Sequence, residues 1–196
     1  MKNETMETIL TRRSMRSFLP DDVPDGLLRS VLTAGQYAPS GSNSQSWRFT
    51  AVCGAERLAR LNEAVKGCFC AMSYPEDAYP AKRAAVKNSR NPDYHFCYRA
   101  PVLILVSNLA GYTNAVADSA AAIENMLLAA HSLGLASCWI NQVTWLGERE
   151  DMRAYLREEY GIPENHRVCG GLALGFPAGK APPAAPRREG CVSIIR

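Results

Sequence analysis

The stretch PVLILVSNLAGYTNAVADSAAAIENMLLAAHSLGLASCWI, residues 101–140, carries the pattern that decides the fold. Val102 to Ser107 is a continuous apolar run after a proline, which is typical of a strand covered on both faces and predicts a central position in a sheet. Ala115 to Leu133 is apolar around most of its circumference and ends at Gly134, so it predicts a helix buried inside the domain or against a partner chain. Ala136 to Ile140 then predicts a second, shorter strand.

Helical and strand patterns alternate on both sides of this stretch. Four more helices are expected: Thr5 to Arg12 with Thr5 as its cap, Pro24 to a stop at Pro39, Ala55 to about Lys66, and Glu148 to Tyr160. Two more strands are expected, at Trp47 to Cys53 and Val168 to Leu174. Because helices and strands interleave with few hairpin signals, the sequence predicts an α/β fold of the α+β sandwich type, with a central mixed sheet flanked by helices. No linker divides two cores, so residues 1–196 are expected to form a single domain.

Two segments lack a regular pattern. Residues 67–98 contain three prolines with several tyrosines and lysines, and an irregular stretch of this length is usually functional or mobile, so we expect a lid there. The C-terminal extension, residues 177–196, is rich in proline and alanine up to Arg188, and we expect it to run along a surface of this chain or of another subunit.

Composition excludes several classes of protein. The chain has 196 residues, of which 47% are hydrophobic and 21% charged, and this balance indicates a compact soluble domain. A net charge of +3 gives no support for a nucleic-acid or membrane partner. The N-terminus lacks the apolar core of a signal peptide, charged residues interrupt the longest apolar stretch, and the cysteines lie in apolar contexts. We therefore expect a cytoplasmic protein.

The densest cluster of chemistry is Arg12-Arg13-Ser14-Met15-Arg16, at the exit of the first helix. Arginine binds phosphate through two parallel hydrogen bonds, so three guanidiniums and a hydroxyl indicate a phosphate site. The alternative is a solvated last turn of a helix, where cations are favourable in any case. A third hypothesis, a nucleic-acid-binding module, lacks a wider basic stripe and is opposed by the acidic Asp21-Asp22.

A second cluster is the loop Ala38-Pro-Ser-Gly-Ser-Asn-Ser-Gln-Ser-Trp47. Its amides and hydroxyls offer donors and acceptors to a planar polar ring, with Trp47 as an apolar wall. The alternative is an ordinary turn rich in Asn, Ser and Gly.

Together, the two clusters resemble the opening of the FMN-dependent nitroreductase family. The resemblance continues through Glu124 to Ala130 and Leu133 to Leu135, and it ends at Leu172-Ala-Leu-Gly-Phe-Pro177. It covers nearly the whole chain, with Gly67 to Tyr98 the least matched part. One departure is Ser46, where relatives commonly have proline.

The resemblance implies FMN as the cofactor and a homodimer whose FMN sites lie at the subunit interface. The arginine cluster would hold the phosphate and ribityl chain, the Pro-Ser loop would reach the flavin of the other subunit, and β-strand amides near Cys138 would face the reactive ring. Basic residues after the last proline stretch would complete the phosphate site. The cofactor-binding residues expected from this resemblance are Arg12, Arg13, Ser14, Arg16, Pro39, Ser40, Ser42, Asn43, Ile140, Asn141 and either Arg187 or Arg188.

The resemblance also implies an NAD(P)H-dependent oxidoreductase that reduces a nitroaromatic, a quinone or a related acceptor by two successive hydride transfers. No catalytic side chain is expected, because the flavin carries the chemistry. No metal is expected, since the three histidines are widely separated and no cysteine pair has zinc spacing. Two alternatives stay open: a protein that stores or senses FMN without turnover, and specialised flavin chemistry such as reductive dehalogenation.

Overall fold

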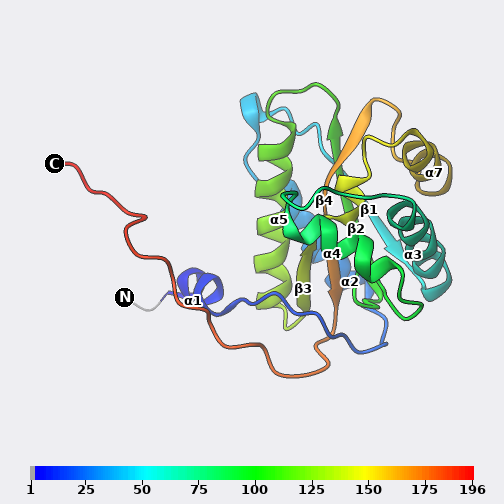
Figure 1. Cartoon of the computed structure of the whole chain (residues 1–196). Coiled ribbons are helices and arrows are strands. Elements are labelled where there is room, and N and C mark those ends of the chain that lie inside the picture. Colours follow the sequence, from blue (N-terminus) through cyan, green and yellow to red (C-terminus); the bar gives the residue numbers. More distant parts are fainter. Residues whose placement is uncertain (1–2) are drawn as a thin grey trace.

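The computed structural model describes residues 3–196. Four strands form one sheet in the order β1-β2-β4-β3 (Figure 1). Their bounds are Arg48–Cys53 for β1, Val102–Leu109 for β2, Ala136–Ile140 for β3 and His166–Gly175 for β4. The α/β class with helices on the sheet is confirmed, and β2 is central as predicted.

Strand direction differs from the expected mixed sheet, because all three neighbouring pairs are antiparallel. Interleaved helices usually join parallel strands. Here the long connection from β1 through two helices returns the chain in the opposite direction, so β2 pairs with β1 antiparallel from Arg48 opposite Ser107 to Cys53 opposite Val102.

Seven α-helices surround the sheet in the part of the chain that the structure describes. They are α1 (Glu4–Thr11), α2 (Asp25–Gln36), α3 (Ala55–Cys70), α4 (Pro80–Ser89), α5 (Ala115–Ser132), α6 (Gln142–Trp145) and α7 (Glu150–Tyr160), and a short 3₁₀ turn spans Gly41–Asn43. Residues 67–98 were expected to be irregular, and this expectation is wrong in part, because they contain the end of α3 and all of α4. Pro80 starts α4 in its first turn, where a proline fits a helix, so this proline marks a beginning and not a break.

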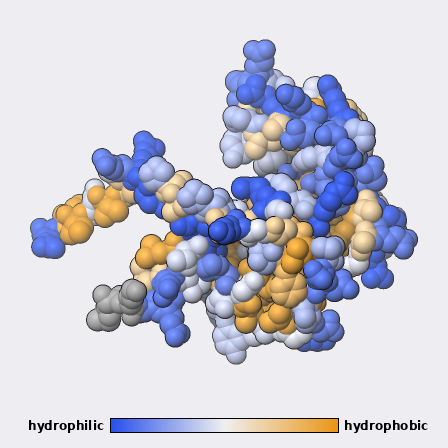
Figure 2. Space-filling model, turned by 90° about the horizontal axis from the view of Figure 1, so that it is seen from below, coloured by the Kyte–Doolittle hydropathy of each residue, from blue (hydrophilic) through white to orange (hydrophobic). Residues whose placement is uncertain are grey.

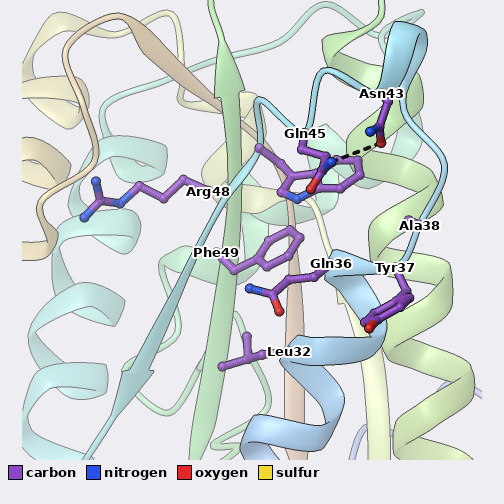
Figure 3. Close-up of a pocket in the computed structure, with 9 residues that line it drawn as sticks. Leu32, Gln36, Tyr37, Ala38, Asn43, Gln45, Arg48 and Phe49 are labelled. Carbon is purple, nitrogen blue, oxygen red and sulfur yellow. Dashed lines mark hydrogen bonds between the residues drawn. The ribbon is translucent and has the colours of Figure 1, made fainter.

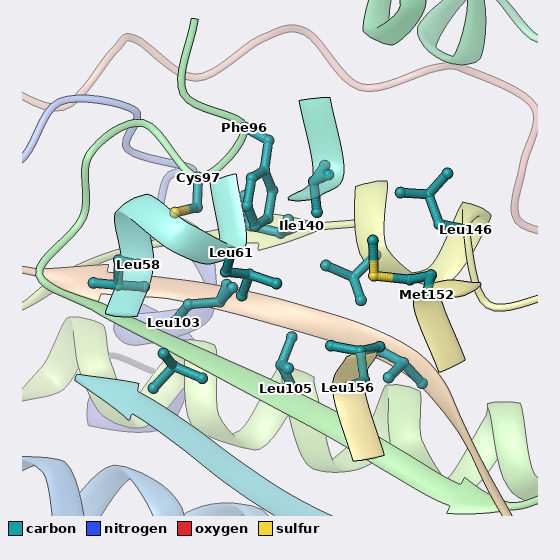
Figure 4. Close-up of a cluster of buried hydrophobic side chains, with 14 of the residues drawn as sticks. Leu58, Leu61, Phe96, Cys97, Leu103, Leu105, Ile140, Leu146, Met152 and Leu156 are labelled. Carbon is teal, nitrogen blue, oxygen red and sulfur yellow. The ribbon is translucent and has the colours of Figure 1, made fainter. Parts of the chain in front are cut away.

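Alternation along β2 explains its continuous apolar run. Leu103 and Leu105 point into a cluster beneath α3, α6 and α7, which includes Leu61, Phe96 and Leu156 (Figure 4). Their neighbours along the strand, Val102, Ile104 and Val106, belong to a second cluster on the opposite face, under α2 and α5. The result is a three-layer sandwich in which both faces of the central strands are covered.

Close packing of α5 on the sheet depends on a glycine in β4. A Cβ atom added to Gly170 would lie 2.5 Å from the Cδ1 atom of Ile123 on α5. The central helix is therefore buried on this side, as predicted, with Ile123, Met126 and Leu127 in the core.

Helix α1 and the C-terminal extension lie outside these layers. The side chain of Asn3, and not the expected Thr5, caps α1 by accepting a hydrogen bond of 3.0 Å from the backbone N–H of Met6. The C-terminal extension contains no regular element, as predicted, and extends away from the body as an exposed arm (Figure 1). Its beginning pairs with the segment after α1 through a bridge between Phe18 and Pro177.

Candidate functional site

The chain that leaves α1 runs alongside the edge strand β3. The backbone N–H of Met15 donates to the carbonyl oxygen of Ser137 at 2.9 Å, and Ser14 forms a parallel bridge with the same residue. We call residues 12–16 the arginine segment. Its position brings the expected phosphate residues next to the strand whose far end carries the expected Ile140 and Asn141.

Arg12 is partly buried. Its Nη1 atom is buried and has no hydrogen-bond partner within residues 3–196, and its Nε atom lies 4.0 Å from a carboxylate oxygen of Glu124. A buried guanidinium nitrogen without an acceptor is costly, so it indicates a place for an acceptor that the chain itself does not supply.

Arg13 behaves differently from its neighbour. Its Nη1 atom donates to the carbonyl oxygens of Leu10 at 2.8 Å and Arg12 at 2.6 Å. It therefore satisfies carbonyls at the end of α1, which is the ordinary role of a cation at a helix C-terminus.

Arg16 lies between a tyrosine ring and a buried thiol. Its guanidinium carbon is 5.9 Å from the centroid of the Tyr98 ring. Burial raises the pKa of the Cys138 thiol, despite the opposing charges of Arg16 and a hydrogen bond with Ser14, so this thiol is neutral at pH 7. No carboxylate forms an ion pair with Arg16 in the described chain, and its positive charge is available to a ligand.

At the far end of β3, Ile140 is buried and Asn141 is fixed by its own strand. The indole N–H of Trp139 donates to Asn141 Oδ1 at 2.8 Å. Asn141 comes four residues after Ser137, a distance of about 13 Å along an extended chain, so the arginine segment and Asn141 mark the two ends of one edge.

The Pro39 to Asn43 loop is anchored to the N-terminal part of α5. The backbone N–H of Gly41 lies 3.2 Å from both carboxylate oxygens of Asp118, and the Tyr112 hydroxyl donates to the Gly41 carbonyl at 3.2 Å. A Cβ atom at Gly41 would lie 2.7 Å from that hydroxyl, so glycine permits this approach. Neither Asp118 nor Tyr112 was singled out by the sequence, since contacts over about 70 residues leave no local pattern.

This loop holds three residues in a left-handed backbone conformation. Ser42 has φ 53°, Asn43 has φ 52° and Gln45 has φ 47°, although none of them is glycine. Such conformations cost about 1–3 kcal/mol each and concentrate at ligand sites. Their concentration here favours a binding loop over an ordinary turn.

A cavity of about 830 Å³ opens between this loop, the end of α2 and β1 (Figure 3). Trp47 forms part of its wall as predicted, stacked on Phe49 with ring centroids 6.0 Å apart. Gln45 Nε2 donates to Asn43 Oδ1 at 3.0 Å, which fixes the Asn43 side chain at the rim. The cavity is lined by Leu32, Gln36, Tyr37, Ala38, Asn43, Gln45, Trp47, Arg48 and Phe49.

The loop and the arginine segment lie on different sides of α5 within one chain. Arg12 approaches Glu124, whereas Gly41 contacts Asp118, six residues earlier on the helix. Six residues correspond to about 9 Å along the axis and about 120° around it. The two groups that the sequence assigns to one site are therefore not brought together in a single chain.

The remaining expected residues, Arg187 and Arg188, lie in the exposed arm. No hydrogen bond or ion pair joins either side chain to the arginine segment between residues 3 and 196. The described residues contain no group of three or more His, Cys, Asp and Glu side chains that could hold a metal ion, and no helix among them is long and apolar enough to cross a membrane.

Fold and site together define a layered α/β chain with a cationic segment along one edge of its sheet. The profile of the Nitroreductase family matches residues 9–176, and the chain belongs to this family. A crystal structure of a nitroreductase with bound FMN from Bacteroides fragilis NCTC 9343 is 41% identical, with a TM-score of 0.89 and full coverage of both chains.

Two further relatives share lower identity. A protein of Archaeoglobus fulgidus with the provisional name NADH dehydrogenase/NAD(P)H nitroreductase is 33% identical over 174 residues, 89% of this chain and 86% of the relative. The NADPH-flavin oxidoreductase of Vibrio harveyi is 29% identical and aligned over 89% of this chain and 66% of the relative.

Proposed function

We propose that this protein is an FMN-dependent oxidoreductase that uses NAD(P)H to reduce a nitroaromatic, a quinone or a related acceptor in two successive hydride transfers. The observation that carries the proposal is the arginine segment beside β3, with its buried and unpartnered Arg12 Nη1. Membership in the Nitroreductase family and the FMN in the Bacteroides fragilis structure support it.

The residues along this edge fit FMN. A phosphate or a polarised flavin oxygen supplies the acceptor that Arg12 Nη1 lacks, and Arg16 adds a second cation whose charge no carboxylate in the described chain neutralises. The Ser14 hydroxyl and the amides near Ile140 and Asn141 extend the polar surface along β3. Arg13 fits less well, since carbonyls at the end of α1 already hold its Nη1 atom.

Bound FMN supplies the hydride acceptor and donor, so the chain needs no nucleophile or acid–base pair of its own. The protein's contribution is to bind and orient the cofactor and to stabilise negative charge on it. Preorganised cations and amide donors do this best where water is excluded, and Arg12 and Arg16 are placed for that role.

We infer that the complete site needs two copies of the chain. The loop with Pro39, Ser40, Ser42 and Asn43 lies on another side of α5 from the arginine segment, so a second copy would bring its loop to the first copy's arginines. Exposed apolar groups support this: α1 has no buried residue although it carries Met6, Ile9 and Leu10. The end of the C-terminal arm is apolar and exposed as well, at Val192, Ile194 and Ile195 (Figure 2).

The arm and the edge strand β1 are the further surfaces that a second copy would cover. An open strand edge and an exposed apolar arm are both unfavourable in an isolated chain. In such a dimer, Arg187 or Arg188 would approach the phosphate from the arm, although neither does so within one chain.

The test is the visible absorption spectrum of the purified protein with added FMN, recorded anaerobically before and after NADH and then NADPH. A bound flavin that bleaches within the mixing time supports the reductive step and identifies the donor. A flavin that binds and is reduced by neither donor supports storage or sensing. Protein that does not bind FMN contradicts the proposal. That result favours the alternative in which the arginine segment is only the solvated last turn of a helix. Acceptors are then screened by reoxidation, with halogenated phenols included to test dehalogenation.

A further inference from the structure

The turn before β2 brings an aromatic ring to the arginine segment. Tyr98 lies at the end of residues 67–98, and its ring centroid is 5.9 Å from the guanidinium carbon of Arg16. A guanidinium within about 6 Å of an aromatic face is attracted by the ring's electrons. This contact joins two parts of the chain that are more than 80 residues apart, and no sequence motif includes Tyr98.

The backbone at this turn is held in an unusual conformation. Tyr98 has φ 59° and Arg99 has φ 56°, a left-handed conformation that bulky side chains rarely adopt. Three hydrogen bonds fix the turn: from Tyr98 N to the His95 carbonyl at 3.0 Å, from Ala100 N to the Cys97 carbonyl at 3.1 Å, and from the Arg99 guanidinium to the Asp93 carbonyl at 3.2 Å. Two successive residues in this strained conformation, held by three hydrogen bonds, indicate that the fold fixes the direction in which the Tyr98 side chain points.

The Tyr98 side chain also packs against the core. Tyr98 and Tyr94 are both partly buried against the cluster beneath α3 and α7. The ring that contacts Arg16 is therefore partly buried and not a free surface side chain.

Arg16 has few other groups to hold it. Its pKa is raised above the ordinary value, first by the ionised form of Cys138 and then by the Tyr98 hydroxyl, while burial acts in the opposite direction. Since Cys138 is itself neutral at pH 7, the contact that holds the guanidinium is the one with the Tyr98 ring, 5.9 Å away. Without it, a long arginine side chain would be free to sample many rotamers.

We propose that Tyr98 is a positioning residue that holds the Arg16 guanidinium over its ring and directs it toward the anionic part of FMN at the β3 edge. This inference rests on the proposed function. It assigns a role to the last of residues 67–98, a segment from which the sequence singled out no cofactor-binding residue. Tyr98 acts through Arg16, so its contribution to binding disappears when Arg16 is absent.

The experiment is a fluorescence titration of FMN into the apoprotein, for wild type and for Tyr98→Leu, Tyr98→Phe, Arg16→Gln and the double variant Tyr98→Leu with Arg16→Gln. Tyr94→Leu is the matched control, because it removes a ring of the same size from the same cluster without touching Arg16. Urea unfolding of each apoprotein checks that the variants are folded.

We expect Tyr98→Leu to raise the Kd for FMN about 3- to 30-fold, the range of a guanidinium–ring interaction, and Tyr98→Phe to stay within about twofold of wild type because the ring is kept. In the Arg16→Gln background, Tyr98→Leu should change the Kd less than about twofold.

Two results would overturn the inference while leaving the proposed function intact. In one, the effects of Tyr98→Leu and Arg16→Gln are additive; in the other, Tyr94→Leu weakens FMN binding as much as Tyr98→Leu does. If Tyr98→Leu lowers stability too far for a titration, Tyr98→Phe and Tyr98→Met decide, since methionine fills the space without an aromatic face. Wild-type protein that does not bind FMN overturns the proposed function and this inference with it.

Discussion

The backbone N–H of Met15 donates to the carbonyl oxygen of Ser137 at 2.9 Å, and this bond ties the arginine segment to the edge of the sheet. Its consequence is that side chains on both sides of Met15 keep a fixed register with β3. Arg12 and Arg16 therefore lie at defined positions along one edge, although their own segment belongs to no helix or strand of the sheet.

Replacing Arg12 by glutamine should weaken FMN binding about 10- to 150-fold, the equivalent of one charged hydrogen bond of about 1.5–3 kcal/mol. The reason is that its buried Nη1 is free for a ligand acceptor. Equilibrium dialysis against FMN measures the effect. Arg29→Gln, an exposed change of the same kind on α2, is the control and should leave the Kd unchanged. Equal affinity of wild type and Arg12→Gln for FMN would show that Arg12 does not bind the cofactor.

Asn108→Ala should lower the free energy of unfolding by about 1–3 kcal/mol, because it leaves several buried polar groups unpaired. Asn108 is fully buried at the end of β2, accepts from the Ser46 hydroxyl at 2.7 Å, and donates to Ala115 O and Ser119 Oγ at 3.3 Å. The bond from the Ser46 hydroxyl to this buried side chain fixes the end of the loop.

Urea unfolding monitored by circular dichroism tests the Asn108 prediction. Asn88→Ala, on the exposed face of α4, provides the matched control and should change stability by less than about 0.5 kcal/mol. If the two variants unfold at the same urea concentration, the network around Asn108 does not stabilise the loop.

Sequence patterns predicted most of the fold because they are local. The apolar run of β2 and the alanine-rich α5 each have a period or a length that only one buried element fits. Strand direction was mispredicted, since the pairing of β1 with β2 depends on a connection of almost 50 residues and not on either strand. Helix α4 was missed because the three prolines of residues 67–98 indicate breaks in a helix, whereas Pro80 lies in the first turn of α4, where a proline fits.

The sequence singled out the arginine segment and the loop because their residue types are dense and contiguous, and their role in binding the cofactor stays a prediction. It missed Tyr98, because nothing in a tyrosine indicates a left-handed backbone. It also missed Asp118, whose contact with Gly41 spans 77 residues. Residues that act by long-range contact leave no pattern in one sequence, whereas residues that act as a contiguous group do.

Stability should fall as the pH drops from about 6.5 to about 4, in part through His95. Burial, with the charge of Arg99 adding to it, lowers the pKa of His95 to about 4, while the unfolded chain titrates near 6.5. Between these values the unfolded state binds more protons than the folded state, so the contribution of His95 is complete above pH 6.5 and is lost toward pH 4. For this half-buried ring, screened by solvent, the loss is on the order of 1–2 kcal/mol.

Urea midpoints of wild type and His95→Gln across pH 4–7 measure this contribution. The glutamine variant should show a flatter dependence on pH in that range, whereas His131→Gln, at a less buried histidine on α5, should flatten it less. Parallel curves for wild type and His95→Gln would show that the ring titrates normally in the folded protein.

Leu10→Glu should convert the proposed homodimer into monomers. Leu10 is 62% exposed on α1, a helix with no buried residue, and an eight-residue helix gains little stability from its own backbone. A symmetric interface contains each residue twice, so a charge at position 10 removes the burial of two leucines, about 3–6 kcal/mol. The dimer dissociation constant should rise about 10²- to 10⁴-fold.

Light scattering after gel filtration at micromolar concentration measures the mass, and FMN binding should fall in the same samples because the loop of the second copy is lost. Ala84→Glu, which adds the same charge to an exposed position on α4, is the control and should leave the mass unchanged. A wild-type protein that elutes as a monomer of 21.4 kDa yet binds FMN tightly would contradict both the dimer and the shared site.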